Sequence, residues 1–131
     1  MKSLRFTFCF ALMLAAFALA IDKISIPELL KEAKTYDGKT VETTGIVDQF
    51  KQKTSRAGNK YFTFKLRVSE KDPASINVYS QGEAEEAIKD GAKVKVIGVF
   101  REEKKVMDFT VKNEVDATKV KDKENGVKVL K

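Results

Sequence analysis

The sequence predicts an all-β domain with minor α, in which five antiparallel strands close into a barrel. One observation is the alternation of polar and apolar side chains along Tyr61–Val68, which is typical of a strand with one buried face. Another is the order of the expected elements, because three strands are followed by a short helix and then by two further strands. The third is a pair of mid-strand glycines, Gly45 and Gly98, where a long strand can bend and serve two sheets.

The first 20 residues have the pattern of a secretory signal peptide, so they are left out of the fold prediction. Basic residues near the start precede an apolar run over residues 6–19, which ends in the small-residue pattern Ala18-Leu19-Ala20. Cleavage there would make Ile21 the first residue of a periplasmic or secreted protein with no stable membrane span. An uncleaved anchor is the alternative, although the run is shorter than the roughly 20 residues that a spanning helix needs.

The composition excludes several classes of site. The chain has a net charge of +6, of which Lys2 and Arg5 would be removed with the signal peptide. Its single cysteine, Cys9, would also be removed, and the chain contains no histidine and no tryptophan. Disulfide-stapled folds, the usual zinc and haem sites, and Ser-His-Asp or Cys-His catalysis therefore lack their residues. We expect a basic domain that has no cofactor and is held together by a packed core.

Residues 21–37 are expected to form an N-terminal helix. Ser25 and Glu28 have the spacing of a capping box, and Pro27 falls in the first turn, where its missing N–H does no harm. The turn around Asp37-Gly38 ends the helix. Its apolar stripe would pack on the domain and consists of Ile26, Leu29, Leu30 and Ala33.

The predicted barrel occupies residues 38–113. Period-two alternation and flanking turn residues predict its five strands at about 40–51, 61–69, 75–80, 93–102 and 106–113. Between the third and fourth strands, Glu83–Lys89 has apolar residues at helical spacing, so a short helix is expected there. Residues 114–131 alternate Lys with Val, Asp and Glu, and are interpreted as a C-terminal tail that is mobile or attached loosely as a strand.

The apolar faces of these strands define the expected core. Side chains that share one face of a strand point to the same side of the sheet, and the apolar side should be buried. The residues expected to be buried are Phe62, Phe64, Leu66, Ile76, Val78, Val94, Val96 and Phe109.

Four segments carry a resemblance to a known fold: Gly45–Val47, Gly58–Leu66, Ile76–Ser80 and Asp90–Phe100. Together they resemble the OB-fold nucleic-acid-binding domain of the anticodon-binding type, and the resemblance covers residues 38–113. It implies a ligand groove on the second and third strands, between the loop of the first hairpin and the loop of the last. Exported haem chaperones with this fold attach haem through a histidine, so this chain is not expected to bind haem.

Charges and rings on the expected groove are the candidate ligand-binding residues. Tyr61 and Tyr79 point outward and would stack on bases, while nearby cations would neutralise phosphates. These cations surround the first hairpin loop, line the second strand or flank the last hairpin, and are Lys53, Arg56, Lys60, Lys65, Arg67, Arg101 and Lys104. The same lysines could instead only keep an exported protein soluble. No catalytic or metal-ligating residue is predicted.

Three functions follow from these observations. The main prediction is an exported binding module for single-stranded nucleic acid or another polyanion. The alternative is a periplasmic module that binds a protein or a polysaccharide and no nucleic acid. An enzyme is least favoured, because its catalysis would need converging carboxylates. The only strand-borne acids to recruit are Glu42, Asp48, Glu102 and Asp108.

Overall fold

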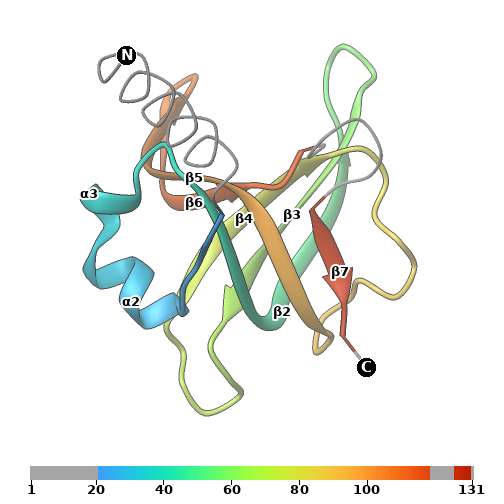
Figure 1. Ribbon diagram of the computed structural model, residues 1–131. Coiled ribbons are helices and arrows are strands. Elements are labelled where there is room, and N and C mark those ends of the chain that lie inside the picture. The colour runs from blue at the N-terminus through green and yellow to red at the C-terminus, as the bar shows by residue number, and fades with distance from the viewer. Residues whose placement is uncertain (1–20, 119–125, 131) are drawn as a thin grey trace, which may run out of the picture.

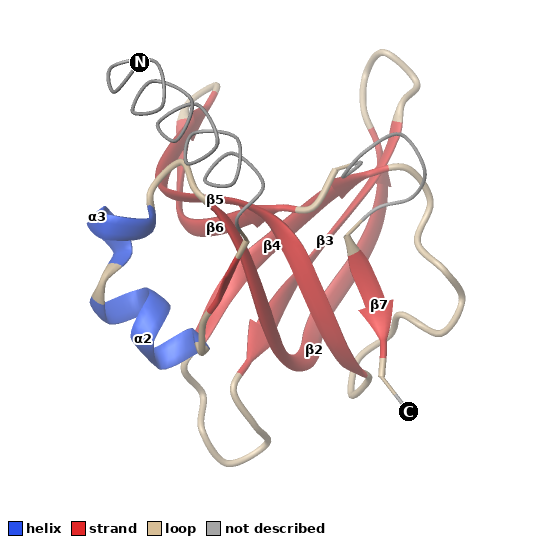
Figure 2. Cartoon of the chain, in the orientation of Figure 1, coloured by secondary structure: helices blue, strands red, loops and turns tan. Residues whose placement is uncertain are grey.

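A computed structural model describes residues 21–118 and 126–130, so the predicted signal peptide lies outside the described residues. The described chain is mostly β, and its seven strands form one sheet (Figure 1). Two short helices lie together beside one side of this sheet (Figure 2). The elements are β1 (Asp22–Lys23), α2 (Ile26–Lys31), α3 (Ala33–Tyr36), β2 (Thr40–Thr54), β3 (Lys60–Arg67), β4 (Ser75–Gln81), β5 (Lys93–Val106), β6 (Phe109–Asp116) and β7 (Val127–Val129).

Five of the strands pair in a partial ring. The order is β2-β3-β4-β6-β5, and β5 pairs in turn with β2. The ring is weakest between β4 and β6, which share only three residue pairs, Asn77–Tyr79 with Glu114–Asp116. This pairing is parallel, whereas the other four are antiparallel. The expectation of antiparallel strands throughout is wrong at this junction, because strand direction cannot alternate fully around a ring with an odd number of strands.

Strand β2 serves both sides of the ring, and Gly45 lies where its partner changes. Residues 40–46 pair with β5, and the pairing with β3 starts at Ile46. A Cβ on Gly45 would overlap the carbonyl oxygen of Arg67, so only glycine allows the two backbones to approach this closely. The register shift itself comes later, between Asp48 and Lys51, where Gln49 has a left-handed φ of 53°.

The single N-terminal helix predicted over residues 21–37 is two short helices. The Oγ atom of Ser25 accepts a hydrogen bond from the backbone N–H of Glu28 at 3.4 Å, which confirms the predicted N-cap. Glu32 leaves the helical region, with φ −112° and ψ 36°, and separates α2 from α3. Ile26 and Leu29 are buried, so α2 packs its apolar side on the sheet.

The prediction of a short helix between the third and fourth strands is wrong, because residues 83–92 form an irregular loop with turns at 86–87 and 90–91. Of the expected helical segment Glu83–Lys89, only Ile88 is buried. A helix of seven residues with one buried side chain cannot recover the cost of helix nucleation. The segment is held by bonds to β2: the Ala84 N–H donates to Gln52 Oε1 at 2.9 Å, and Asp90 Oδ1 accepts from the Phe50 N–H at 2.8 Å.

The expected core is confirmed at seven of its eight positions, but Phe109 is not buried. Its side chain is 71% exposed because the β5–β6 hairpin is longer than predicted. The predicted turn around Glu103–Lys105 is still part of β5, and the chain reverses only at Met107-Asp108. The end of this hairpin therefore projects beyond the ring as a two-stranded ribbon, and no other strand or helix of residues 21–118 and 126–130 pairs with it (Figure 1).

Part of the segment expected to be a tail is strand. β6 continues to Asp116, and β7 pairs with β5, with Val127 opposite Val96 and Val129 opposite Val94. Val127 is buried, so β7 adds an apolar side chain to the core.

Candidate ligand-binding groove

An open groove of about 260 Å³ crosses the outer face of β2, β3, β4 and β6. Its lysines are Lys51, Lys53 and Lys65. Lys51 and Lys53 lie on the same side of β2 because they are two residues apart. Lys65 follows on the outer face of β3, whose inner face holds the buried residues Phe62, Phe64 and Leu66. The strand alternation seen in the sequence is therefore what gathers these charges.

The groove is electrically asymmetric. Its cations lie on β2 and β3, whereas β6 contributes the carboxylate of Glu114 to the opposite side. The register explains this order, because Lys65 is opposite Asn77 and Asn77 is opposite Glu114. Asn77 also binds β6 directly, since its Nδ2 donates to the carbonyl oxygen of Lys112 at 2.8 Å. An anion in this groove would be attracted to the lysines of the β2–β3 side.

Two tyrosines lie in contact beside the groove. The ring centroids of Tyr61 on β3 and Tyr79 on β4 are 5.7 Å apart, and the ring planes are tilted by 38°. Both side chains are half-buried, so each is packed on one side and open on the other. Half-open aromatic rings beside cations are the usual surface on which single-stranded bases stack.

Lys104 of β5 connects this aromatic pair to β6. Its Nζ lies 4.6 Å from the ring centroid of Tyr79 and 3.0 Å from Glu114 Oε1. The side chain of Glu114 is only 8% exposed. Lys104 therefore neutralises a nearly buried carboxylate, so most of the lysine's positive charge is used by this ion pair and is not available to a ligand.

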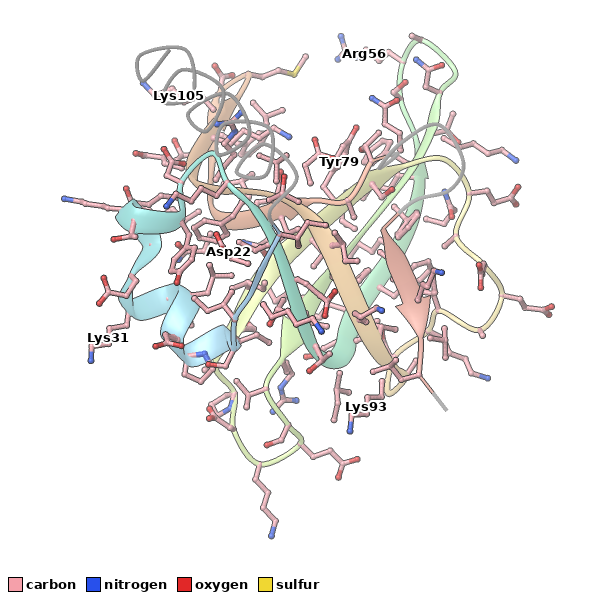
Figure 3. All side chains as sticks on the ribbon, viewed as in Figure 1. Asp22, Lys31, Arg56, Tyr79, Lys93 and Lys105 are labelled. Carbon is pink, nitrogen blue, oxygen red and sulfur yellow. The ribbon has the colours of Figure 1, made fainter. Side chains whose placement is uncertain are left out.

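Two hairpins flank the groove. Figure 3 shows Tyr79 between their ends, with Arg56 on the β2–β3 loop and Lys105 near the end of the β5–β6 hairpin. The β2–β3 loop is closed by Ser55, whose Oγ accepts from the Asn59 N–H at 3.1 Å. The two hairpins form the sides of the groove, and its floor is the β3–β4 sheet surface.

The structure brings together five of the nine predicted ligand-binding residues. Lys53 and Lys65 line the groove, and Tyr61, Tyr79 and Lys104 form the neighbouring cluster.

Arg56 and Lys60 lie at the edge of this group. Arg56 is exposed on the β2–β3 loop. Lys60 is exposed at the start of β3 and lies 3.6 Å from Glu83 Oε2. This exposed ion pair is weak and could be exchanged for a ligand anion.

Arg67 and Arg101 are not brought to the groove. Arg67 lies at the far end of β3, where its Nη2 donates to the carbonyl oxygen of Glu70 at 3.1 Å and its Nη1 is 3.9 Å from Asp48 Oδ2. The guanidinium of Arg101 approaches Gly38, in the turn between α3 and β2. Nothing in the sequence indicates either placement.

The groove contains residues that the sequence-based site prediction omitted. Lys51 and Thr63 follow from strand alternation, because each is two residues from a predicted site residue. Glu114 could not be identified in this way, because its segment was expected to be a tail. Val111 also lines the groove, on β6, which begins three residues later than predicted.

In residues 21–118 and 126–130, no group of three or more His, Cys, Asp or Glu side chains could hold a metal ion. Neither helix in that part of the chain is long and apolar enough to cross a membrane.

No protein-family model and no curated protein matches the sequence. Among solved structures, the chain is similar to a lipoprotein from Klebsiella pneumoniae subsp. pneumoniae MGH 78578, which is provisionally described as nucleic acid-binding. The TM-score is 0.51 and the sequences are 18% identical, over 89% of this chain and 96% of the other. At this identity the likeness shows a similar fold.

Proposed function

We propose that the partial ring is an OB barrel of the anticodon-binding type and that the protein is an exported module for single-stranded nucleic acid or another polyanion. The strand order supports the barrel. β2, β3 and β4 are neighbours in sequence order, β6 lies next to β4, and β5 lies between β6 and β2 and so closes the ring. In this fold, the groove between the first and last hairpins is the usual ligand site.

One observation carries the functional proposal: the contacting rings of Tyr61 and Tyr79 lie beside the lysines of the groove. Phosphates would bind Lys51, Lys53 and Lys65, and bases would stack on the tyrosines. The similar Klebsiella structure, described as nucleic acid-binding, is consistent with this ligand class.

Export is proposed from the signal-peptide pattern of residues 1–20 and from the description of the similar structure as a lipoprotein. Mass spectrometry of the protein from its native host tests it. We expect a mature chain that begins at Ile21, whereas an intact Met1 in the cytosolic fraction would contradict export.

Fluorescence anisotropy with a labelled oligothymidylate tests the ligand. Affinity should fall steeply between two salt concentrations, because bound lysines release counterions from the phosphates. The triple variant Lys51→Ala/Lys53→Ala/Lys65→Ala should bind more weakly. The slope of log affinity against log salt concentration (the salt slope) should also become shallower, by about 0.7 for each phosphate that is no longer neutralised.

A matched control is Lys31→Ala/Lys71→Ala/Lys93→Ala, which removes the same charge from exposed positions outside the groove. It should change the affinity much less than the groove variant does. Equal weakening in both variants would mean that only net charge matters. No binding at low salt would reject the nucleic-acid proposal and favour the protein or polysaccharide alternative.

A further inference from the structure

The end of the β5–β6 hairpin carries large apolar side chains in solvent. Val106, Met107 and Phe109 are 41%, 84% and 71% exposed. Among the residues that the structure describes, Ile21 is the only other large hydrophobic side chain that is this exposed. Exposed apolar residues that cluster at one point indicate a surface that meets a ligand or partner.

The pleat of the hairpin determines the direction in which two of these side chains point. Lys104 is opposite Val111, and the next pair on the same face is Val106 opposite Phe109. Lys104 lies over Tyr79, and Val111 lines the groove. Val106 and Phe109 therefore continue the groove-facing side of the hairpin out to its end.

The groove thus has two unlike walls. The β2–β3 side carries Lys51, Lys53 and the exposed Arg56, whereas the β5–β6 side carries Val111, Val106 and Phe109. Glu114, at the base of the apolar wall, is paired with Lys104, so this pair leaves little net charge there to attract phosphate. A ligand that fits both walls must be anionic along one edge and apolar or aromatic along the other.

We infer that Phe109 is a specificity-determining residue that stacks on a base and selects single-stranded nucleic acid over polyanions without rings. This inference rests on the proposed function. The backbone phosphates would follow the lysines of β2 and β3, while the bases turn toward the tyrosines and then toward Phe109. A ring-free polyanion would satisfy only the basic wall.

Two probes of equal length distinguish binding to the basic wall from binding to the apolar wall. One is a labelled oligothymidylate, and the other is the corresponding oligomer of abasic sugar-phosphate units, which has the same phosphates and no bases. The native protein should bind oligothymidylate more tightly. Phe109→Ala should weaken oligothymidylate binding about 5- to 150-fold, the range expected when one stacking ring is removed. It should leave both the abasic affinity and the salt slope unchanged.

Thr110→Ala is the control, because Thr110 is also exposed but lies on the other face of the same hairpin. It should bind both probes like the native protein. If Phe109→Ala binds oligothymidylate normally while the lysine variant does not, the inference fails and the proposed function stands. If Phe109→Ala weakened binding of both probes equally, the inference would also be overturned, because the Phe109 ring would then not be contacting bases. If neither probe binds the native protein at low salt, both proposals fail.

Discussion

Lys104 of β5 and Glu114 of β6 form an ion pair at the β6 side of the groove, with 3.0 Å between Nζ and Oε1. The side chain of Glu114 is 8% exposed and that of Lys104 is 34% exposed. Lys104 also lies over Tyr79 of β4. The pair therefore bridges the β4–β6 junction, where the ring has only three paired residues on each strand.

Replacing Lys104 by Met should destabilise the protein by about 1–3 kcal/mol, because the nearly buried carboxylate of Glu114 would lose its countercharge. Partial exposure of Lys104 keeps the cost below that of a fully buried pair. Urea denaturation measures the change. The double variant Lys104→Met/Glu114→Gln should recover most of the stability, and Lys105→Met, at an exposed neighbouring position, should have little effect. Native stability in Lys104→Met would show that the pair contributes nothing.

Phe64→Ala should cost about 3–5 kcal/mol of unfolding free energy, because the ring is buried and stacks on Phe62 with centroids 6.3 Å apart. Phe109→Ala makes the same chemical change at an exposed site and should stay within about 0.5 kcal/mol of the native protein. Thermal denaturation distinguishes the two. Similar melting temperatures for both variants would contradict the assignment of inner and outer faces.

Thr43→Val should stabilise the protein by about 1 kcal/mol. Within the described residues, Thr43 Oγ1 is a buried oxygen without a hydrogen-bond partner, and an unpartnered hydroxyl is unfavourable in an apolar core. Valine has nearly the same shape and removes the hydroxyl. The exposed neighbour Thr44→Val is the control and should not gain stability from this effect. A lower denaturation midpoint for Thr43→Val would mean that the hydroxyl is satisfied in solution.

Gly45→Ala should destabilise the protein by about 1–3 kcal/mol, because the new methyl group would overlap the backbone carbonyl of Arg67. A backbone atom cannot move away by changing rotamer, so β2 and β3 would have to separate. Thr44→Ala provides a control at the adjacent exposed position, and differential scanning calorimetry would compare the two. Unchanged stability of Gly45→Ala would show that the two backbones do not approach each other closely.

Much of the fold was predictable because its signals are local. The alternation in Tyr61–Val68 assigns the inner and outer faces of β3 without knowledge of its neighbours. Ser25 could be identified as an N-cap because its partner, Glu28, is three residues away. Tyr61 and Lys65 were placed on the groove side for the same reason, since their direction follows from the pleat alone.

Other features depended on residues distant in the sequence. Glu83–Lys89 has helical spacing, but the Ala84 N–H donates to the side chain of Gln52 on β2 instead. Arg67 and Arg101 are basic like Lys65, yet Arg67 lies beside Asp48 of β2 and Arg101 lies beside Gly38, away from the groove.

Phe109 illustrates the same limit for burial. The sequence shows that Phe109 and Val111 share one face of a strand, but it does not show what covers that face. To predict whether Phe109 is buried, one must know where the ring of five strands ends, and the β5–β6 hairpin extends beyond that point. The sequence by itself determined which side chains share a face of each strand, because that depends on a two-residue period. Only the tertiary structure decided which faces are covered and which charges remain free, because these depend on strand lengths and on contacts between residues far apart in the chain.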